Sequence, residues 1–300
     1  MILPKPQPVD STKNLRDRVD RLFREPVKKS NKLDQQTLDL STILNCESKI
    51  DYPSKNITGF LNFITDAIPD GDVYLFGGVL RDLALLGRKG FNSDIDLVVE
   101  GNWSHFVTYL ESLNVDKNKF GGYRLTVDGW PVDIWNAKET WAIKQGLVPY
   151  KGIASLTETT VLNWDAILMN WRTKNFVYRK NYFEEINSRV LDIVLEKNPN
   201  PLGMAVRVFR HLCLKDARKI TPAAAKYLAK CADMYSFEVI REAEIGSYKN
   251  TIVAPAVHRF FEHIDTAANI NIQHQFSIAS DILKKELGLN DLGLQKQSQT

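Results

Sequence analysis

The chain has 300 residues, of which 44% are hydrophobic and 25% are charged, and its formal net charge at pH 7 is +3. This composition excludes a collagen-like, mucin-like or largely disordered chain, and the length favours two domains. No run approaches the roughly 18 consecutive apolar residues of a spanning helix, which argues against a membrane protein. The N-terminus lacks the apolar run of a secretory signal, and the three cysteines form no C-x-x-C motif, so we expect a cytoplasmic protein.

Basic residues are concentrated in two segments of the chain. Residues 201–230 contain seven Lys or Arg against one acidic residue, and residues 1–35 contain nine against five. Such patches suit partners that carry phosphate groups. A solvated basic helix face is the alternative that charge alone leaves open.

The N-terminal region is polar, and its first fifty residues contain four prolines. Between the prolines, Leu15, Val19, Leu22 and Phe23 recur at helical spacing. We therefore expect an appended N-terminal arm, residues 1–54, with one short amphipathic helix.

Helical and strand patterns alternate between residues 55 and 150. A helix at 58–69 is followed by a strand at 72–76 and a second helix at 79–87. A strand at 93–101 and a helix at 103–114 come next. The last element is a hairpin, 122–127 and 130–135, that turns on Asp128–Gly129, a dipeptide suited to tight hairpin turns. This alternation predicts an α/β domain at residues 55–150.

Strand signals fade after about residue 155. The segments 155–171, 201–219 and 221–234 all have the pattern of helices. We therefore expect a mostly helical body at residues 151–288, followed by a frayed tail at residues 289–300.

Acidic residues mark the start of the second predicted strand. Alternation along that strand places Asp94 and Asp96 on one face and the apolar Ile95 and Leu97 on the other. Two neighbouring carboxylates repel each other unless a cation lies between them, and Mg²⁺ prefers oxygen ligands. Asp133, on the second strand of the hairpin, completes a cluster of three carboxylates if the two strands pair in one sheet. Such a cluster can hold two metal ions roughly 3.5–4 Å apart.

A Gly77–Gly78 pair lies between the first predicted strand and the helix that follows it. Without Cβ atoms the backbone can approach a ligand closely, and the amides at the start of a helix favour anions. A Gly-Gly turn with a purely structural role is the alternative. The order of these features is more specific than any one of them.

Together the features resemble the polymerase-β-like nucleotidyltransferases, and within them the poly(A) polymerase head domain shared with bacterial CCA-adding enzymes. The resemblance rests on FGGVLRDLALLG at 76–87, SDIDLVV at 93–99 and VDIW at 132–135. It implies an α/β (α+β) nucleotidyltransferase head with a mixed sheet, followed by a mostly α-helical neck and body.

The resemblance also implies roles for individual residues. Asp94, Asp96 and Asp133 would be the catalytic acids and would bind two Mg²⁺ ions, with Mn²⁺ as a possible substitute. Asp133 would serve the ion that activates the incoming 3′-hydroxyl. Gly77 and Gly78 would cradle the triphosphate.

Four more residues match nucleotide-binding positions of the family. Arg81 and Asp82 match its Arg-Asp pair, although from the residues alone Arg81 could instead pair with Asp82. Arg207 and Arg210 match the arginines of the neck helix, where Asn200 stands at a position that is often Asp. A basic outer face on a core helix is the alternative for these two arginines. Helical spacing assigns an apolar and a basic face to residues 201–219, the basic one made of Arg207, His211, Lys215 and Arg218.

The chain departs from the CCA-adding pattern at two points. The stretch that corresponds to the R-R-D-F-T-I-N-A segment, TTVLNWDA at 159–166, contains neither arginine. The E-D-x-x-R element with which those enzymes select C and then A is not found. We therefore expect the nucleotide choice to differ from that of ordinary CCA addition.

These observations predict a metal-dependent, template-independent nucleotidyltransferase. It would move a nucleoside monophosphate from an NTP or dNTP to a hydroxyl, most simply an RNA 3′ end and tRNA first, and release pyrophosphate. One alternative keeps the chemistry in an anti-phage or toxin system that makes a free or self-primed oligonucleotide signal, or nucleotidylates a protein or tRNA. Another is a catalytically silent nucleic-acid-binding module, which three mutually repelling carboxylates disfavour. The sequence does not define the base, the sugar, the number of additions or the oligomeric state.

Overall fold

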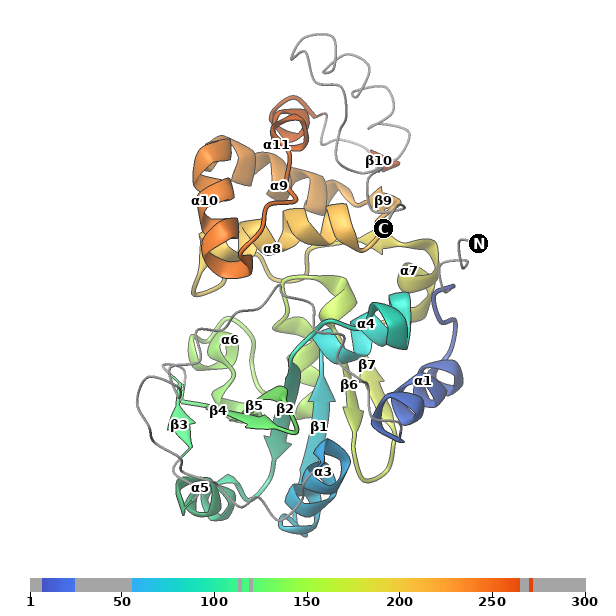
Figure 1. Ribbon diagram of the computed structural model, residues 1–300, viewed down its shortest axis with the longest axis vertical. Helices are drawn as coiled ribbons and strands as arrows, with labels where there is room; N and C mark the ends of the chain where they lie inside the picture. Colours follow the sequence, from blue (N-terminus) through green and yellow to red (C-terminus); the bar gives the residue numbers. More distant parts are fainter. Residues whose placement is uncertain (1–6, 25–55, 113–114, 119–120, 265–269, 272–300) are drawn as a thin grey trace. The chain divides into compact units, whose positions relative to one another are not determined.

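The computed structural model describes residues 7–24, 56–112, 115–118, 121–264 and 270–271 (Figure 1). The chain divides into two compact units. The head unit comprises Met1–Thr160 and Asp165–Phe183, and the body unit comprises Val161–Trp164 and Glu184–Thr300. In the described part of the chain, the helices are too short or too polar to cross a membrane.

A seven-stranded mixed sheet forms the centre of the head unit. Its order is β3 (Asp116–Lys117), β4 (Tyr123–Val127), β5 (Trp130–Asn136), β2 (Ile95–Glu100), β1 (Asp72–Phe76), β6 (Ile167–Asn170) and β7 (Phe176–Tyr178). Strands β2 and β5 are parallel, and every other neighbouring pair is antiparallel. The mixed sheet confirms the predicted fold class of this unit.

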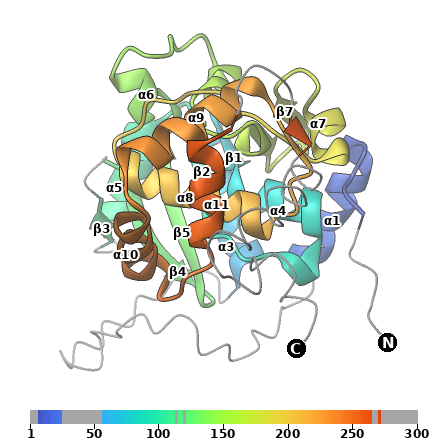
Figure 2. The same ribbon diagram turned by 90° about the horizontal axis from the view of Figure 1, so that it is seen from above.

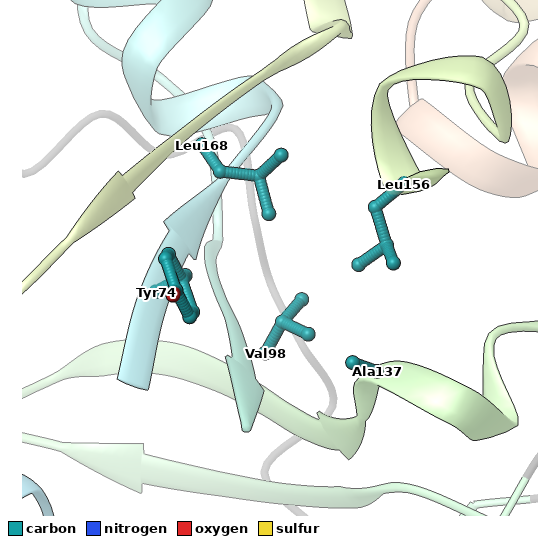
Figure 3. Packing of buried hydrophobic residues seen from close by; sticks show 5 residues of the cluster. All are labelled: Tyr74, Val98, Ala137, Leu156 and Leu168. Atoms are coloured by element: carbon teal, nitrogen blue, oxygen red, sulfur yellow. The ribbon is translucent and has the colours of Figure 1, made fainter. Parts of the chain in front are cut away.

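The core of the head unit includes a cluster of apolar side chains on the central strands. Tyr74, Val98 and Leu168 come from the adjacent strands β1, β2 and β6, and Ala137 and Leu156 pack with them (Figure 3). All five residues are buried. Removing such side chains from water is the main favourable term in folding, so this cluster fixes the central strands relative to one another.

Most elements predicted between residues 55 and 150 are confirmed. The helices α3 (Ile57–Asp66), α4 (Gly78–Leu86) and α5 (Trp103–Ser112) lie at the expected places, and a short α6 (Trp141–Lys144) follows the hairpin. The hairpin turns on Asp128 and Gly129, with φ angles of 51° and 72°, and pairs Val127 with Trp130. These positive φ angles are what the Asp-Gly dipeptide provides at low cost.

Helix α1 (Thr12–Arg24) is a packed part of the head unit, so the prediction of an appended arm is wrong for this segment. The helix lies beside α4 in both views (Figures 1 and 2). The Arg18 guanidinium donates to the carbonyls of Leu83 and Ala84, at 2.8 and 3.1 Å, near the end of α4. Arginine suits that end of a helix, where carbonyls lack partners. Residues 25–54 of the predicted arm lie outside the described residues.

The sheet continues past residue 150, where the sequence analysis placed the end of the head. The α-helix predicted at 155–171 is wrong, because the segment forms two short 3₁₀ helices, Ile153–Glu158 and Asn163–Asp165, followed by β6, all four residues of which are buried. Strand β6 pairs with both β1 and β7. The short apolar run at 166–169 has no periodicity that separates a buried strand from a buried helix.

The body unit is mostly helical, as predicted. Helix α7 (Tyr182–Ser188) spans the boundary between the units, and α8 (Pro201–Leu214), α9 (Pro222–Met234), α10 (Phe237–Tyr248) and α11 (Pro255–Glu262) follow. A small sheet of β8 (Val190–Leu191), β9 (Lys219–Ile220) and β10 (Ile270–Asn271) was not predicted. The helix predicted at 201–219 ends at Leu214, because Asp216 has a φ of 55° and the chain then enters β9. The predicted tail at 289–300 lies outside the described residues.

Candidate active site

Two paired strands bring the predicted acidic residues together. Strands β2 and β5 pair in parallel with Asp96 opposite Asp133, so the condition set by the sequence analysis is met. Asp94 lies one residue before β2. Ile95 and Leu97 are fully buried, whereas Asp94 and Asp96 are half-buried, which confirms the predicted alternation. We call Asp94, Asp96 and Asp133 the acid cluster.

An arginine that the sequence analysis did not identify lies between two members of the acid cluster. Arg124 is opposite Asp133 in the β4–β5 hairpin. Its Nε and Nη2 atoms donate to Oδ1 and Oδ2 of Asp133, at 3.0 and 2.8 Å. Nη2 also donates to Oδ2 of Asp94, at 2.8 Å. Arg124 therefore reduces the repulsion between Asp94 and Asp133.

Burial and charge act in opposite directions on these groups. Burial raises the pKa of Asp133 above its ordinary value, the charge of Asp94 adds to the rise, and Arg124 opposes it. Burial alone would lower the pKa of Arg124, but the hydrogen bond to Asp133 and the charges of all three acids raise it overall. Arg124 is therefore charged at every physiological pH. The side chains of Arg124 and Asp94 are 57% and 45% exposed, so solvent screens their interaction.

The acid cluster has the ligand chemistry for a divalent metal ion. Three carboxylates from two neighbouring strands are the oxygen donors that Mg²⁺ prefers. In the part of the chain that the structure describes, no group of three His, Cys, Asp or Glu side chains forms a metal centre as placed. The carboxylate oxygens are thus of the type that Mg²⁺ prefers, and they come from adjacent strands. The guanidinium of Arg124 is the cation that lies between Asp94 and Asp133.

The Gly77–Gly78 pair links β1 to α4, as predicted. Gly77 precedes the first residue of α4 and has φ 59° and ψ −109°, a combination that side chains with a Cβ atom rarely adopt. A Cβ atom on Gly78 would lie 3.2 Å from Oγ of Ser93, tighter than ordinary packing. Phe76, the residue before the pair, is opposite Asp96, so the start of α4 and the acid cluster lie at the same end of the central strands.

Arg81 pairs with Asp82 inside the protein, as one of the two alternatives from the sequence expected. The Arg81 guanidinium contacts the carboxylates of Asp82 and Asp165, and Nη2 donates to Oγ of Ser93 at 3.0 Å. Asp82 is fully buried and also accepts from Oγ of Ser93 and from the backbone N–H of Asn92, at 2.7 and 3.1 Å. This network fixes the start of α4 to the segment that directly precedes the acid cluster.

The family comparison agrees with this geometry. Residues 57–158 match the family model described as "Nucleotidyltransferase domain". The chain carries a nucleotidyltransferase domain. Both the Gly-Gly pair and the acid cluster lie within the matched residues. The comparison with curated proteins found no match.

Solved structures resemble the chain well beyond this nucleotidyltransferase domain. The CCA-adding enzyme of Thermotoga maritima complexed with tRNA is 18% identical with a TM-score of 0.51, covering 89% of this chain and 54% of that one. CCA-adding enzyme complexes with ATP and with CTP are 17% and 18% identical, with TM-scores of 0.48 and 0.47. They cover 82% and 75% of this chain, and 55% and 52% of their own. The chain thus spans about half the length of these structures, and the first likeness shows the fold alone.

The two predicted neck arginines have different surroundings in the body unit. Arg207 is exposed on α8, whereas Arg210 contacts the fully buried carboxylate of Glu244 and donates to Oδ1 of Asn250 at 2.9 Å. The predicted basic face is wrong at His211, which is buried. Asn200, which stands where the family often has Asp, accepts from the backbone N–H of Gly203 and so caps the start of α8.

Proposed function

We propose that the chain transfers a nucleoside monophosphate from a nucleoside triphosphate to a hydroxyl and releases pyrophosphate. The single observation that carries this proposal is the register of β2 and β5, which brings three carboxylates together beside the start of a helix behind a Gly-Gly pair. That register unites segments that belong to one nucleotidyltransferase domain. Phosphoryl transfer depends on positioning and on charge neutralisation, and this arrangement provides both.

In this proposal Asp94, Asp96 and Asp133 hold two Mg²⁺ ions, for which Mn²⁺ can substitute. Bound there, the ions would neutralise charge on the reacting phosphate and favour deprotonation of the attacking hydroxyl. The amides at the start of α4 would hold the triphosphate, because a helix N-terminus attracts anions and Gly77 and Gly78 let it approach closely.

The buried network around Arg81 would act through position. Its guanidinium contacts carboxylates on both sides, so it does not present a free charge to a phosphate. Its contact with Ser93 instead fixes the residue that precedes Asp94. We therefore assign Arg81 and Asp82 the role of positioning residues for the acid cluster.

We propose RNA, and tRNA first, as the acceptor. The support is a fold shared with a CCA-adding enzyme whose structure contains tRNA. Independent support comes from the body unit, whose basic segment exposes five cationic side chains: Arg207, Arg218, Lys219, Lys226 and Lys230. Exposed cations suit a phosphate backbone. Arg207 is the stronger of the two neck candidates for a nucleotide contact, because Arg210 is bound to Glu244.

The test is transfer of label from each of the eight α-labelled NTPs and dNTPs, with Mg²⁺, with and without total tRNA. The inactive comparison is the double variant Asp94→Asn, Asp96→Asn. A matched control is Asp128→Asn, which makes the same acid-to-amide change in the hairpin turn, where Asn is equally suited. Products are separated into RNA, protein and free oligonucleotide.

We expect label on tRNA from the wild-type protein and from Asp128→Asn, and none from the double variant. Label that requires Asp94 and Asp96, but is found on protein or on a free oligonucleotide ladder without tRNA, would favour the anti-phage or toxin alternative. If the protein binds labelled nucleotide but no fraction contains label that requires Asp94 and Asp96, the proposal is contradicted and the silent binding module is favoured.

A further inference from the structure

The ion pairs of Arg124 use carboxylate oxygens that a metal ion at the acid cluster would also need. The guanidinium occupies both oxygens of Asp133 and one oxygen of Asp94. A divalent ion bound by these aspartates would coordinate oxygens of the same carboxylates. Guanidinium and metal ion are therefore competitors for shared ligands.

The fold sets this placement of Arg124 through the hairpin. Tyr123 and Leu125, its neighbours on β4, are buried, which directs Arg124 to the opposite face. The register of β4 with β5 then places it directly opposite Asp133. Cross-strand partners of opposite charge at such a position are within contact distance.

The exposure of Arg124 differs from that of Arg81, which also bridges two carboxylates in the head unit. The side chain of Arg124 is 57% exposed, so it can move into solvent with little loss of burial. The side chain of Arg81 is 8% exposed and contacts a fully buried carboxylate, so its departure would leave a buried charge uncompensated. Of these two bridging arginines, only Arg124 can leave its carboxylates at low cost.

Charge also favours the replacement of the Arg124 guanidinium by a divalent ion. One guanidinium faces three carboxylates, which leaves the cluster with an excess of negative charge that a divalent ion matches better. Resting on the function proposed above, we propose that Arg124 is a built-in counter-cation of the acid cluster. It holds the aspartates together in the metal-free protein, competes with the divalent ion for them, and leaves when the ion binds.

The test measures Mn²⁺ affinity without nucleotide, from the electron paramagnetic resonance signal of free Mn²⁺. The variants are Arg124→Ala, which removes the competitor, and Arg124→Lys, which keeps the charge without the two-pronged contact. Arg24→Ala is the matched control, because it removes one positive charge from an exposed pair with Asp20 on α1. The set is completed by Arg124→Ala combined with Asp94→Asn and Asp96→Asn.

We expect Arg124→Ala to lower the dissociation constant for Mn²⁺ about five- to tenfold, the size of a partly exposed, two-pronged ion pair. Arg124→Lys should fall between it and the wild type, and Arg24→Ala should stay within about twofold of the wild type. The gain should vanish when Asp94 and Asp96 become amides. A second readout uses the unsubstituted protein: the Nε–Hε resonance of Arg124, assigned by its absence from Arg124→Lys, should shift on titration with Mg²⁺.

Equal Mn²⁺ affinity in the wild type and Arg124→Ala, with affinity still dependent on the aspartates, would overturn the competition and leave the proposed metal site standing. An Nε–Hε resonance that stays unchanged at saturating Mg²⁺ would overturn it as well. The absence of aspartate-dependent Mn²⁺ binding from both proteins would overturn the competition together with the metal site on which it rests.

Discussion

Replacing Arg81 by alanine should cost the head unit much of its stability. The change leaves Asp82 fully buried without the guanidinium that neutralises it, and it also removes the partner of Asp165. Removing one member of a buried ion pair costs about 3–5 kcal/mol. A domain has only about 5–15 kcal/mol in total, so the loss is a large share of it. At about 2–4 °C per kcal/mol for a unit of this size, the melting temperature should fall by about 6–20 °C.

The comparison that makes this prediction specific is Arg124→Ala. Arg124 also bridges two carboxylates, but its side chain is 57% exposed, so its removal should cost less than about 1 kcal/mol. The assay is thermal unfolding followed by circular dichroism and calorimetry, without divalent ions. Adding Asp82→Asn to Arg81→Ala should recover part of the loss, because the buried charge is then gone. Equal melting temperatures for the two arginine variants, or an Arg81→Ala protein within about 2 °C of the wild type, would refute the reasoning.

Three further predictions concern single residues. Gly77→Ala should cost about 1–3 kcal/mol in thermal unfolding, because φ 59° with ψ −109° strains any residue with a Cβ atom; an unchanged melting temperature would contradict this. Burial raises the pKa of Asp133, so the folded wild type loses stability as pH rises through that pKa, and Asp133→Asn should gain relative stability between pH 4 and pH 7 in urea unfolding. A relative loss over that range would show the opposite sign. Burial raises the pKa of Cys231 to about 11, so iodoacetamide at pH 8 should label this thiol only after denaturation, as read by peptide mass spectrometry.

The contact between Arg124 and Asp133 could be predicted from the sequence. A two-residue turn at Asp128–Gly129 pairs Val127 with Trp130, and counting outward along both strands places Arg124 opposite Asp133. The turn and Asp133 are both evident in the sequence, and Arg124 follows from them through the register. Register in a tight hairpin is a local property, and for that reason it can be read from the sequence.

The contact between Asp165 and Arg81, in contrast, could not be predicted from the sequence. Asp165 contacts Arg81 only because β6 pairs with β1 in the sheet, and no local sequence pattern predicts that strand pairing. The run at 166–169 is apolar, so strand and helix have the same pattern there. Helix α1 shows the same limit: its apolar spacing predicted the helix, but its packing against α4 depends on contacts between distant segments.

The acid cluster shows how far motif reasoning extends. Alternation along one strand assigned Asp94 and Asp96 to the same face, and the structure confirms it. The meeting of Asp96 with Asp133 required the parallel pairing of β2 and β5, which the sequence analysis stated as a condition. A metal ion was the cation expected at the aspartates, and the register of the hairpin adds the guanidinium of Arg124 between Asp94 and Asp133.

The central claim, that nucleotidyl transfer depends on carboxylates of both β2 and β5, has one most direct test. Rates of label transfer at saturating nucleotide and Mg²⁺ should be compared for the wild type, Asp96→Asn, Asp133→Asn and Asp128→Asn, with folding verified by circular dichroism. The account predicts that Asp96→Asn and Asp133→Asn each lose about 10²-fold or more, because each removes charge stabilisation at the reacting phosphate. Asp128→Asn should keep the wild-type rate. Transfer at the wild-type rate by folded Asp96→Asn or folded Asp133→Asn would contradict the claim.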